Sequence, residues 1–100
     1  MTTKEAQPAW LKINDDGAVI TLKTPSVVCG ITVDQVTMRA PTIKDVRAAR
    51  KVGGDDEDAA DDVLFASLIG ASQDDVEGLK VWDYNRINKA YFRLVRDDGL

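Results

Sequence analysis

The sequence predicts an α+β fold in which a small N-terminal antiparallel sheet of two to four short strands is followed by three main α-helices. Up to Arg39, apolar and polar residues alternate with the two-residue period of half-buried strands. After Ala40-Pro41, the apolar residues recur with the period of an amphipathic helix. A chain of 100 residues is expected to form one domain, with residues 1–9 as a flexible arm, 10–39 as the β-rich part and 42–97 as the helical part.

The first two strands are expected to form a hairpin. Residues 10–13 and 18–23 flank the turn Asn14-Asp15-Asp16-Gly17. Asp-Gly between two apolar runs is a strong hairpin signal because glycine accepts a positive φ. Thr24-Pro25 is expected to end the second strand, since proline has no N–H to donate to a neighbouring strand.

Extended structure resumes after the proline. Val27-Val28 is followed by a second turn candidate, Cys29-Gly30, and residues 33–39 have the pattern of a further strand. In that strand Val36 and Met38 share one face, because side chains alternate across a strand.

The first helix has a strong start signal and a strong stop signal. Thr42 is the expected N-cap, with Asp45 three residues later as its capping-box partner. Gly53-Gly54 is expected to end the helix. The predicted buried stripe of this helix is Ile43, Val46 and Ala49.

The second helix is predicted to lie at the centre of the fold. An acidic run, residues 55–62, leads into it, and negative side chains are favourable at a helix N-terminus. The segment that follows is apolar on nearly all sides until Gly70 ends it. The predicted buried stripe is Val63, Leu64, Ser67 and Leu68. One short helical turn, capped by Ser72 with Asp75 and closed by Gly78, is expected next.

The last helix is predicted to run from Val81 to Arg96, with Gly99 as its stop. Its predicted core-facing stripe is Tyr84, Ile87, Tyr91, Leu94 and Val95. Phe92 lies about 100° from Tyr91 around a helix, and Trp82 precedes the helix body. Both aromatic side chains are therefore expected to be partly exposed.

This last helix also carries the expected partner-binding surface. Exposed aromatic side chains often dominate protein interfaces, and a polar rim commonly surrounds them. The flanking bases are Arg86, Lys89, Arg93 and Arg96. The candidate partner-binding residues are Trp82, Arg86, Lys89, Phe92 and Arg93.

The composition argues against an enzyme. Histidine is absent, and the single cysteine, Cys29, permits neither an internal disulfide nor a cysteine-rich zinc site. Cys29 is expected to be a half-buried structural residue. The acidic run lacks the glycine and glutamate positions of a calcium loop, and Gly53-Gly54 lacks the lysine of a phosphate-binding loop. We therefore expect no catalytic residue, no cofactor and no metal.

Charge is distributed in blocks along the chain. Residues 39–51 hold five bases and one acid, residues 55–77 hold nine acids and no base, and residues 80–96 again hold five bases and one acid. Such blocks permit pairing within the molecule or head-to-tail association between copies, and solvated helix faces are the simpler interpretation. The formal net charge of −4 disfavours nucleic acid as a partner.

The chain is also expected to be a soluble, cytoplasmic protein. No apolar run approaches the length of a membrane-spanning helix. The first residues, Met1–Gln7, are polar and do not resemble a secretory signal. A lone cysteine is typical of a reducing compartment.

The strand-to-helix junction MRAPTIKDVRAARK (38–51) resembles the Mu-like phage tail assembly chaperone family. In that family a strand ends in an Arg-x-Pro-Thr element and passes into a helix that contains Asp. The segments LFASLIG (64–70) and DVEGLKVWDYNRI (75–87) agree with the same family. The family's glycine at the end of the middle helix, acidic turn, Gly-Leu pair and opening Asp of the last helix correspond to Gly70, Asp74-Asp75, Gly78-Leu79 and Asp83. The resemblance covers roughly residues 18–95.

The resemblance implies a non-enzymatic chaperone. Such proteins bind the tape measure protein and help the tail tube protein to polymerise around it. They act in the cytoplasm of the infected or lysogenic bacterial host and are absent from the mature virion. Self-association is a further expectation. Two alternatives stay open: a structural tail component retained in the virion, and a small regulatory or nucleic-acid-binding protein.

Overall fold

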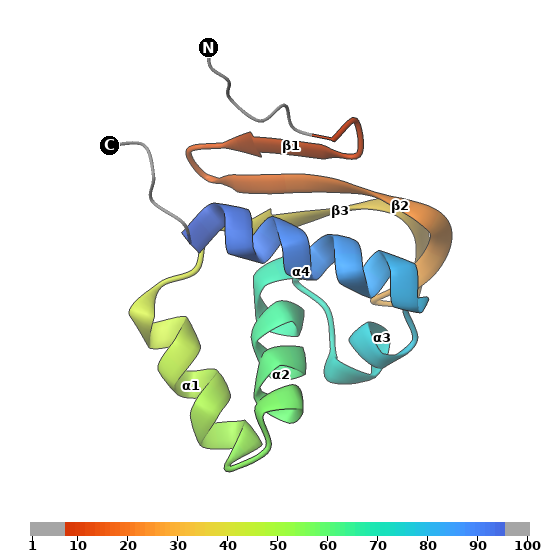
Figure 1. Cartoon of the computed structure of the whole chain (residues 1–100). Helices are drawn as coiled ribbons and strands as arrows, with labels where there is room; N and C mark the ends of the chain where they lie inside the picture. The colour runs from red at the N-terminus through yellow and green to blue at the C-terminus, as the bar shows by residue number, and fades with distance from the viewer. Residues whose placement is uncertain (1–7, 96–100) are drawn as a thin grey trace.

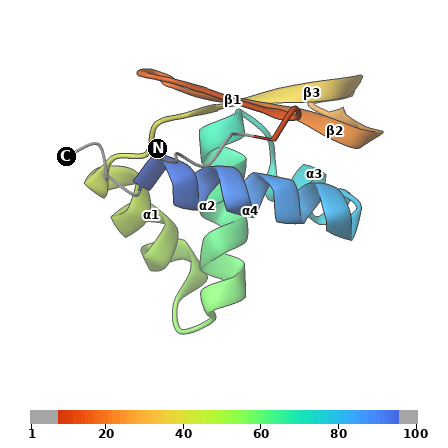
Figure 2. The same cartoon turned by 45° about the horizontal axis from the view of Figure 1, so that its top comes forward.

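The computed structural model describes residues 8–95, which form one sheet and four helices. In chain order the elements are β1 (Leu11–Asn14), β2 (Gly17–Val28), β3 (Ile31–Arg39), α1 (Ile43–Gly53), α2 (Glu57–Ile69), α3 (Gln73–Glu77) and α4 (Val81–Val95). The three strands are antiparallel in the order β1-β2-β3. All four helices lie on one side of the sheet (Figure 2). The predicted α+β class is confirmed, with three longer helices and the short α3.

The helices divide into two arrangements beneath the sheet. α4 runs along the inner face of the sheet and packs on β2 (Figure 1). α1 and α2 lie side by side and extend away from the sheet (Figure 1). Because α2 also contacts α3 and β3, the predicted central position of this helix is confirmed.

Both predicted turns are present. The Asn14 side-chain oxygen accepts hydrogen bonds from the backbone nitrogens of Asp16 (2.8 Å) and Gly17 (3.0 Å), which closes the β1–β2 hairpin. Cys29 and Gly30 form the two-residue loop between β2 and β3. Their φ angles of 54° and 79° have the positive sign that a type I′ hairpin turn requires.

Two residues at these turns differ from expectation. The Cys29 side chain is exposed rather than half-buried, because its turn lies at the end of the hairpin, where the thiol donates to the Gly70 carbonyl oxygen (3.1 Å). Gly17 belongs to β2, and a Cβ at this position would lie 2.0 Å from the Met38 carbonyl oxygen. The close approach of β3 therefore requires glycine here.

The prediction that Thr24-Pro25 ends the second strand is wrong. β2 has 12 residues and runs past the proline to Val28; it contains a bulge between Thr21 and Ser26, where its register with β3 shifts. Proline is tolerated at a bulge because the residue there needs no partner across the ladder. Pro25 therefore lies at an irregularity within one long strand and not at the end of a strand.

The core lies between the inner face of the sheet and the helices. The Phe65 ring meets the rings of Tyr84 and Tyr91 edge to face, at centroid distances of 5.6 and 5.4 Å. The predicted burial of Leu64 and Leu68 is confirmed, and Val36 and Met38, which share one face of β3, are buried as well. The buried apolar residues are Leu11, Ala18, Ile20, Leu22, Val36, Met38, Ala49, Leu64, Phe65, Ala66, Leu68, Val76, Leu79, Ile87 and Ala90.

Three residues of the predicted stripes face solvent instead. Ile43 is 66% exposed, because residues at a spacing of three drift around a helix and Ile43 lies about 120° from the buried Ala49. Ser67 is exposed, and Phe65 occupies the core face of α2 in its place. Val95 is exposed because it lies about 140° from Ala90, which faces the sheet.

Candidate protein-binding surface

α4 divides the candidate partner-binding residues between two places. Trp82 is in the first turn of the helix, beside the β2 bulge, where it contacts residues of that strand. Arg86, Lys89, Phe92 and Arg93 lie further along α4, where they approach the segment around Trp10. The structure therefore does not gather the five residues into one site. The proposed rim residue Arg96 and the predicted end of the helix lie outside the described residues.

Trp82 packs against the β2 bulge through one edge of its ring. Its indole N–H donates to the Thr24 hydroxyl oxygen (3.1 Å), and the Lys23 ammonium lies 5.0 Å from the ring centroid. Because 46% of the side chain stays exposed, the predicted partial exposure of Trp82 is confirmed.

Arg86 connects α4 to the strands. Its guanidinium donates to the Thr21 carbonyl oxygen (2.6 Å) and lies 5.1 Å from the centroid of the Trp10 ring. A guanidinium over an indole face is attracted by the negative potential of the ring. Arg86 thus holds the N-terminal segment against α4, a role that the rim prediction did not include.

A groove lies between the start of β1 and the second half of α4. We name it the Trp10 groove; its lining residues are Pro8, Trp10, Leu11, Lys89, Phe92 and Arg93. Its volume is about 230 Å³. Phe92 is 56% exposed, which confirms its predicted partial exposure, and its ring meets the Tyr91 ring at 5.8 Å.

The residues that complete this groove were not predicted from the sequence. Pro8, Trp10 and Leu11 are far from α4 in the sequence, and no local pattern joins them to Phe92. The available signal was Trp10, a large aromatic residue at the start of a short edge strand. Such a ring needs an apolar neighbour that one strand cannot supply.

A buried carboxylate, Asp83, was also missed as a structural residue. The side chain is fully buried, and its two oxygens accept hydrogen bonds from the backbone nitrogens of Lys23 (2.6 Å) and Thr24 (3.1 Å). These N–H groups lie in the bulge, where β3 offers them no register partner. Asp83 therefore fixes α4 to the irregular part of β2.

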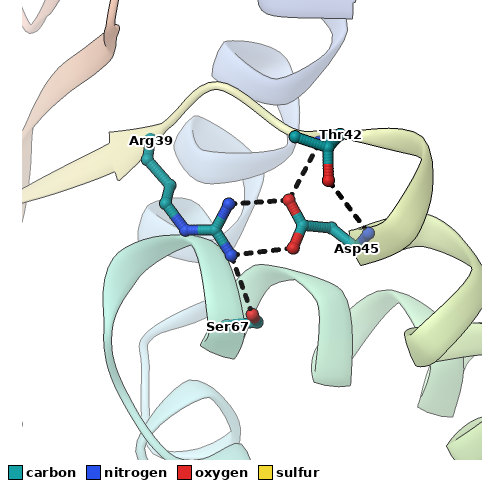
Figure 3. Close-up of polar contacts among 4 residues, drawn as sticks. All are labelled: Arg39, Thr42, Asp45 and Ser67. Atoms are coloured by element: carbon teal, nitrogen blue, oxygen red, sulfur yellow. Dashed lines mark hydrogen bonds and ion pairs between the residues drawn. The ribbon is translucent and has the colours of Figure 1, made fainter.

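The junction between β3 and α1 is held by the residues of the Arg-x-Pro-Thr element (Figure 3). Arg39 donates two hydrogen bonds to the Asp45 carboxylate, at 2.6 and 2.8 Å, and a third to the Ser67 hydroxyl at 3.3 Å. Asp45 accepts from the Thr42 backbone nitrogen (2.9 Å), while Thr42 caps the helix by accepting from the Asp45 nitrogen (3.2 Å). The predicted capping box is confirmed.

The same contacts set the charge state of this junction. The bonds from Arg39, and then that from the Thr42 N–H, hold the pKa of Asp45 well below its usual range. The Asp45 carboxylate in turn raises the pKa of Arg39. Both partners stay ionised at neutral pH, so the pair orients α1 on the sheet and is not a proton-transfer site.

The short helix α3 is fixed in a similar way. Ser72 and Asp75 form the predicted capping box, and Asp75 also accepts a hydrogen bond from the Cys29 backbone nitrogen (3.0 Å). The Cys29 and Ser72 N–H groups lower the pKa of Asp75. The β2–β3 turn is therefore attached to α3.

The acidic start of α2 lies beside basic α1. Arg50, Glu57 and Asp61 line one hollow between the two helices, so charge blocks of opposite sign are neighbours within the molecule. Partial burial and the nearby carboxylates raise the pKa of Asp61. Burial and the hydrogen bond to Asp62 raise the pKa of the Tyr84 hydroxyl, which donates to that carboxylate at 3.0 Å.

Neither a metal cluster nor a membrane span occurs in the described part of the chain. Within residues 8–95, no three His, Cys, Asp or Glu side chains are grouped so that they could hold a metal ion. In the same range, no helix is both long enough and apolar enough to cross a bilayer.

Comparison with known proteins identifies the family. A family model described as "Phage tail assembly chaperone proteins, E, or 41 or 14" matches residues 19–96. Neither a curated protein nor a solved structure gives a significant match. The family match covers most of the chain and includes the β3–α1 junction, the α2–α3 segment and α4. This chain belongs to the phage tail assembly chaperone family.

Proposed function

We propose that this chaperone binds the tape measure protein and assists assembly of the tail tube around it. Family membership establishes a non-enzymatic role in tail assembly. The tape measure protein as client, the tail tube protein as a second partner, and self-association are parts of the proposal. So is its place of action, the cytoplasm of the infected or lysogenic host, with no copy retained in the finished virion.

The exposed aromatic surface of α4 is the observation that carries this proposal. Trp82 and Phe92 are each about half exposed, whereas Ile87 and Ala90 of the same helix are fully buried in the core. Lys89 lines the Trp10 groove together with Phe92, and Lys80 immediately precedes α4. Apolar side chains within a charged surround are typical of a protein-binding patch.

The acidic start of α2 supports the chaperone role in a different way. Most of its carboxylates face solvent, and they give the chain much of its negative charge. A client with exposed apolar stripes aggregates readily, and added net charge on the complex opposes that association. In this proposal α4 supplies the binding surface, and the acidic start of α2 supplies the solubilising surface.

Affinity capture tests the proposed client. The tagged chain is co-expressed with the tape measure protein of the same phage, and the eluate is analysed by mass spectrometry. The proposal predicts a stable complex. A tape measure protein that is expressed in soluble form but absent from the eluate would contradict it.

Purified virions test whether the chain leaves the tail. The proposal predicts peptides of this chain in lysates of cells that are assembling phage and none in purified particles. Stoichiometric recovery from the particles would instead make it a structural component of the tail.

A further inference from the structure

We propose that the Trp10 groove binds one large apolar side chain of an amphipathic client helix whose neighbouring residues are acidic. This inference rests on the proposed function, because the client helix belongs to the tape measure protein. It adds a location on this chain and a chemical class for the segment that is recognised.

The size and lining of the groove favour a side chain over a small molecule. The groove has a volume of about 230 Å³, whereas pockets for drug-sized ligands usually span about 300–1,000 Å³. Four of its six lining residues are apolar, and Leu11, which is 2% exposed, belongs to the core below. No carboxylate, hydroxyl or thiol lines it to orient a polar cofactor.

The wall around Trp10 is already fixed in the free protein. The Leu11 backbone nitrogen donates to the Pro8 carbonyl oxygen (3.0 Å), and the Thr21 nitrogen donates to the Trp10 carbonyl oxygen (2.8 Å). Arg86 stacks on the Trp10 ring while it donates to the Thr21 carbonyl oxygen. A partner therefore meets a preorganised surface and loses less free energy to ordering.

The charge around the groove favours an acidic partner. The charged residues that line it, Lys89 and Arg93, are both basic. The one acidic residue in the sequence of α4, Asp83, is fully buried under the β2 bulge and does not reach this surface. Carboxylates beside the apolar anchor would be attracted to this rim, whereas lysines and arginines would be repelled.

The acidic run of a second copy fits this groove poorly. An occupant needs an exposed apolar anchor next to its carboxylates. In this chain Leu64 and Phe65, which lie just after the acidic run, are buried in the core, and the exposed apolar residue just before the run, Val52, has a small side chain. A copy would therefore offer negative charge without a large apolar side chain to fill the groove.

Matched variants and labelled peptides test the inference. Fluorescein-labelled synthetic segments that tile the tape measure protein are titrated with the full chain, and binding is followed by anisotropy. Phe92→Ser removes a groove wall, and Val81→Ser removes an exposed apolar side chain of α4 outside the groove. Lys89→Glu reverses a rim charge, and Lys44→Glu makes the same change of net charge on exposed α1. Thermal unfolding checks that each variant is folded.

The inference predicts that the bound segments carry acidic residues around a large apolar one. Phe92→Ser should raise the dissociation constant by more than about fivefold, and Val81→Ser should leave it unchanged. Lys89→Glu should weaken binding at low salt more than Lys44→Glu, and added salt should reduce the difference. Replacing the segment's Asp and Glu by Asn and Gln should weaken binding of the wild-type chain.

Three contradicting outcomes are distinguishable. If the wild-type chain binds the tape measure protein but folded Phe92→Ser and Lys89→Glu bind it equally well, the groove inference is wrong and the proposed function stands. If no segment and no intact tape measure protein binds the wild-type chain, the proposed function itself is wrong. Concentration-dependent self-association that Phe92→Ser abolishes, without client binding, would make the groove an interface between copies and overturn the inference.

Discussion

The carboxylate of Asp83 on α4 lies 2.6 Å from the backbone nitrogen of Lys23 on β2, although 60 positions separate the two residues in sequence. The second carboxylate oxygen accepts from the next nitrogen, that of Thr24. The bulge that carries these N–H groups would otherwise leave them without partners in the ladder. This contact sets the position of α4, and with it the position of Trp82 and the Trp10 groove.

Removing the Asp83 carboxylate should therefore destabilise the fold. Asp83→Ala leaves two donors of the bulge without an acceptor, and such a loss usually costs about 1–3 kcal/mol. Asp83→Asn should cost less, because the amide oxygen can still accept one of the bonds. Urea unfolding measures the loss of stability in both variants. The control is Asn85→Ala, at an exposed position of the same helix. Equal stability of Asp83→Ala and Asn85→Ala would show that the bond contributes nothing.

Truncation of Leu68 should have a larger effect. Its side chain is 2% exposed at the C-terminal end of central α2, so Leu68→Ala removes core contacts and should cost about 2–5 kcal/mol. The exposed Val52→Ala on α1 is the control and should change stability little. Because we propose that residues 1–100 form one domain, both proteins should unfold in one cooperative transition. Separate transitions for the sheet and the helices would contradict that proposal.

The β3–α1 junction should make stability depend on pH. The pKa of Asp45 is lower in the folded chain than in the unfolded one, where a value near 3.9 is usual. The pair's contribution is therefore complete above that unfolded value and is lost as pH falls through the folded one. Asp45→Asn should lose less stability between pH 7 and pH 3 than the wild type, as measured by urea midpoints. Asp34→Asn, on the exposed part of β3, is the control and should follow the wild-type curve.

The acidic run should govern solubility more than folding. The test variant replaces Asp55, Asp56, Glu57 and Asp58 by serine, which changes the formal net charge from −4 to 0. Asp56 caps α2 by accepting from the Ala59 nitrogen (3.1 Å), and serine can also cap a helix, so the fold should persist. Proteins near zero net charge associate readily, so solubility at low salt should fall.

A charge-neutral control separates this effect from substitution itself. It replaces four exposed uncharged residues by serine, namely Thr32, Gln35, Thr37 and Asn85. This control keeps the formal net charge at −4 and should stay as soluble as the wild type. Precipitation curves in ammonium sulfate and at low salt compare the three proteins. Equal solubility of the neutralised variant and the control would assign the acidic run another purpose.

The sequence predicted the features that local chemistry determines. The capping boxes of Thr42 with Asp45 and of Ser72 with Asp75 each span only three residues, so their side-chain geometry follows from the helix start alone. The Cys29-Gly30 turn is equally local, because a two-residue hairpin loop requires positive φ at both positions.

Features that join distant segments were not predictable in the same way. Pro25 has the pattern of a strand end, and the carboxylate of Asp83, from another element, accepts the hydrogen bonds of the bulge there. The Trp10 groove requires β1 to lie next to Phe92, which periodicity within α4 cannot indicate. Exposure of Phe92 followed from the helical pattern, whereas the wall opposite it depends on tertiary packing.

A sedimentation measurement tests whether this chain keeps a tape measure protein in solution by binding it. The tape measure protein is expressed at matched levels with the wild-type chain, with Phe92→Ser, or alone, and its fraction in the supernatant is quantified after centrifugation. We expect the supernatant fraction of the tape measure protein to rise several-fold with the wild-type chain, and the two proteins to co-elute in gel filtration. An insoluble fraction that the wild-type chain leaves unchanged, with both proteins well expressed, would contradict the account.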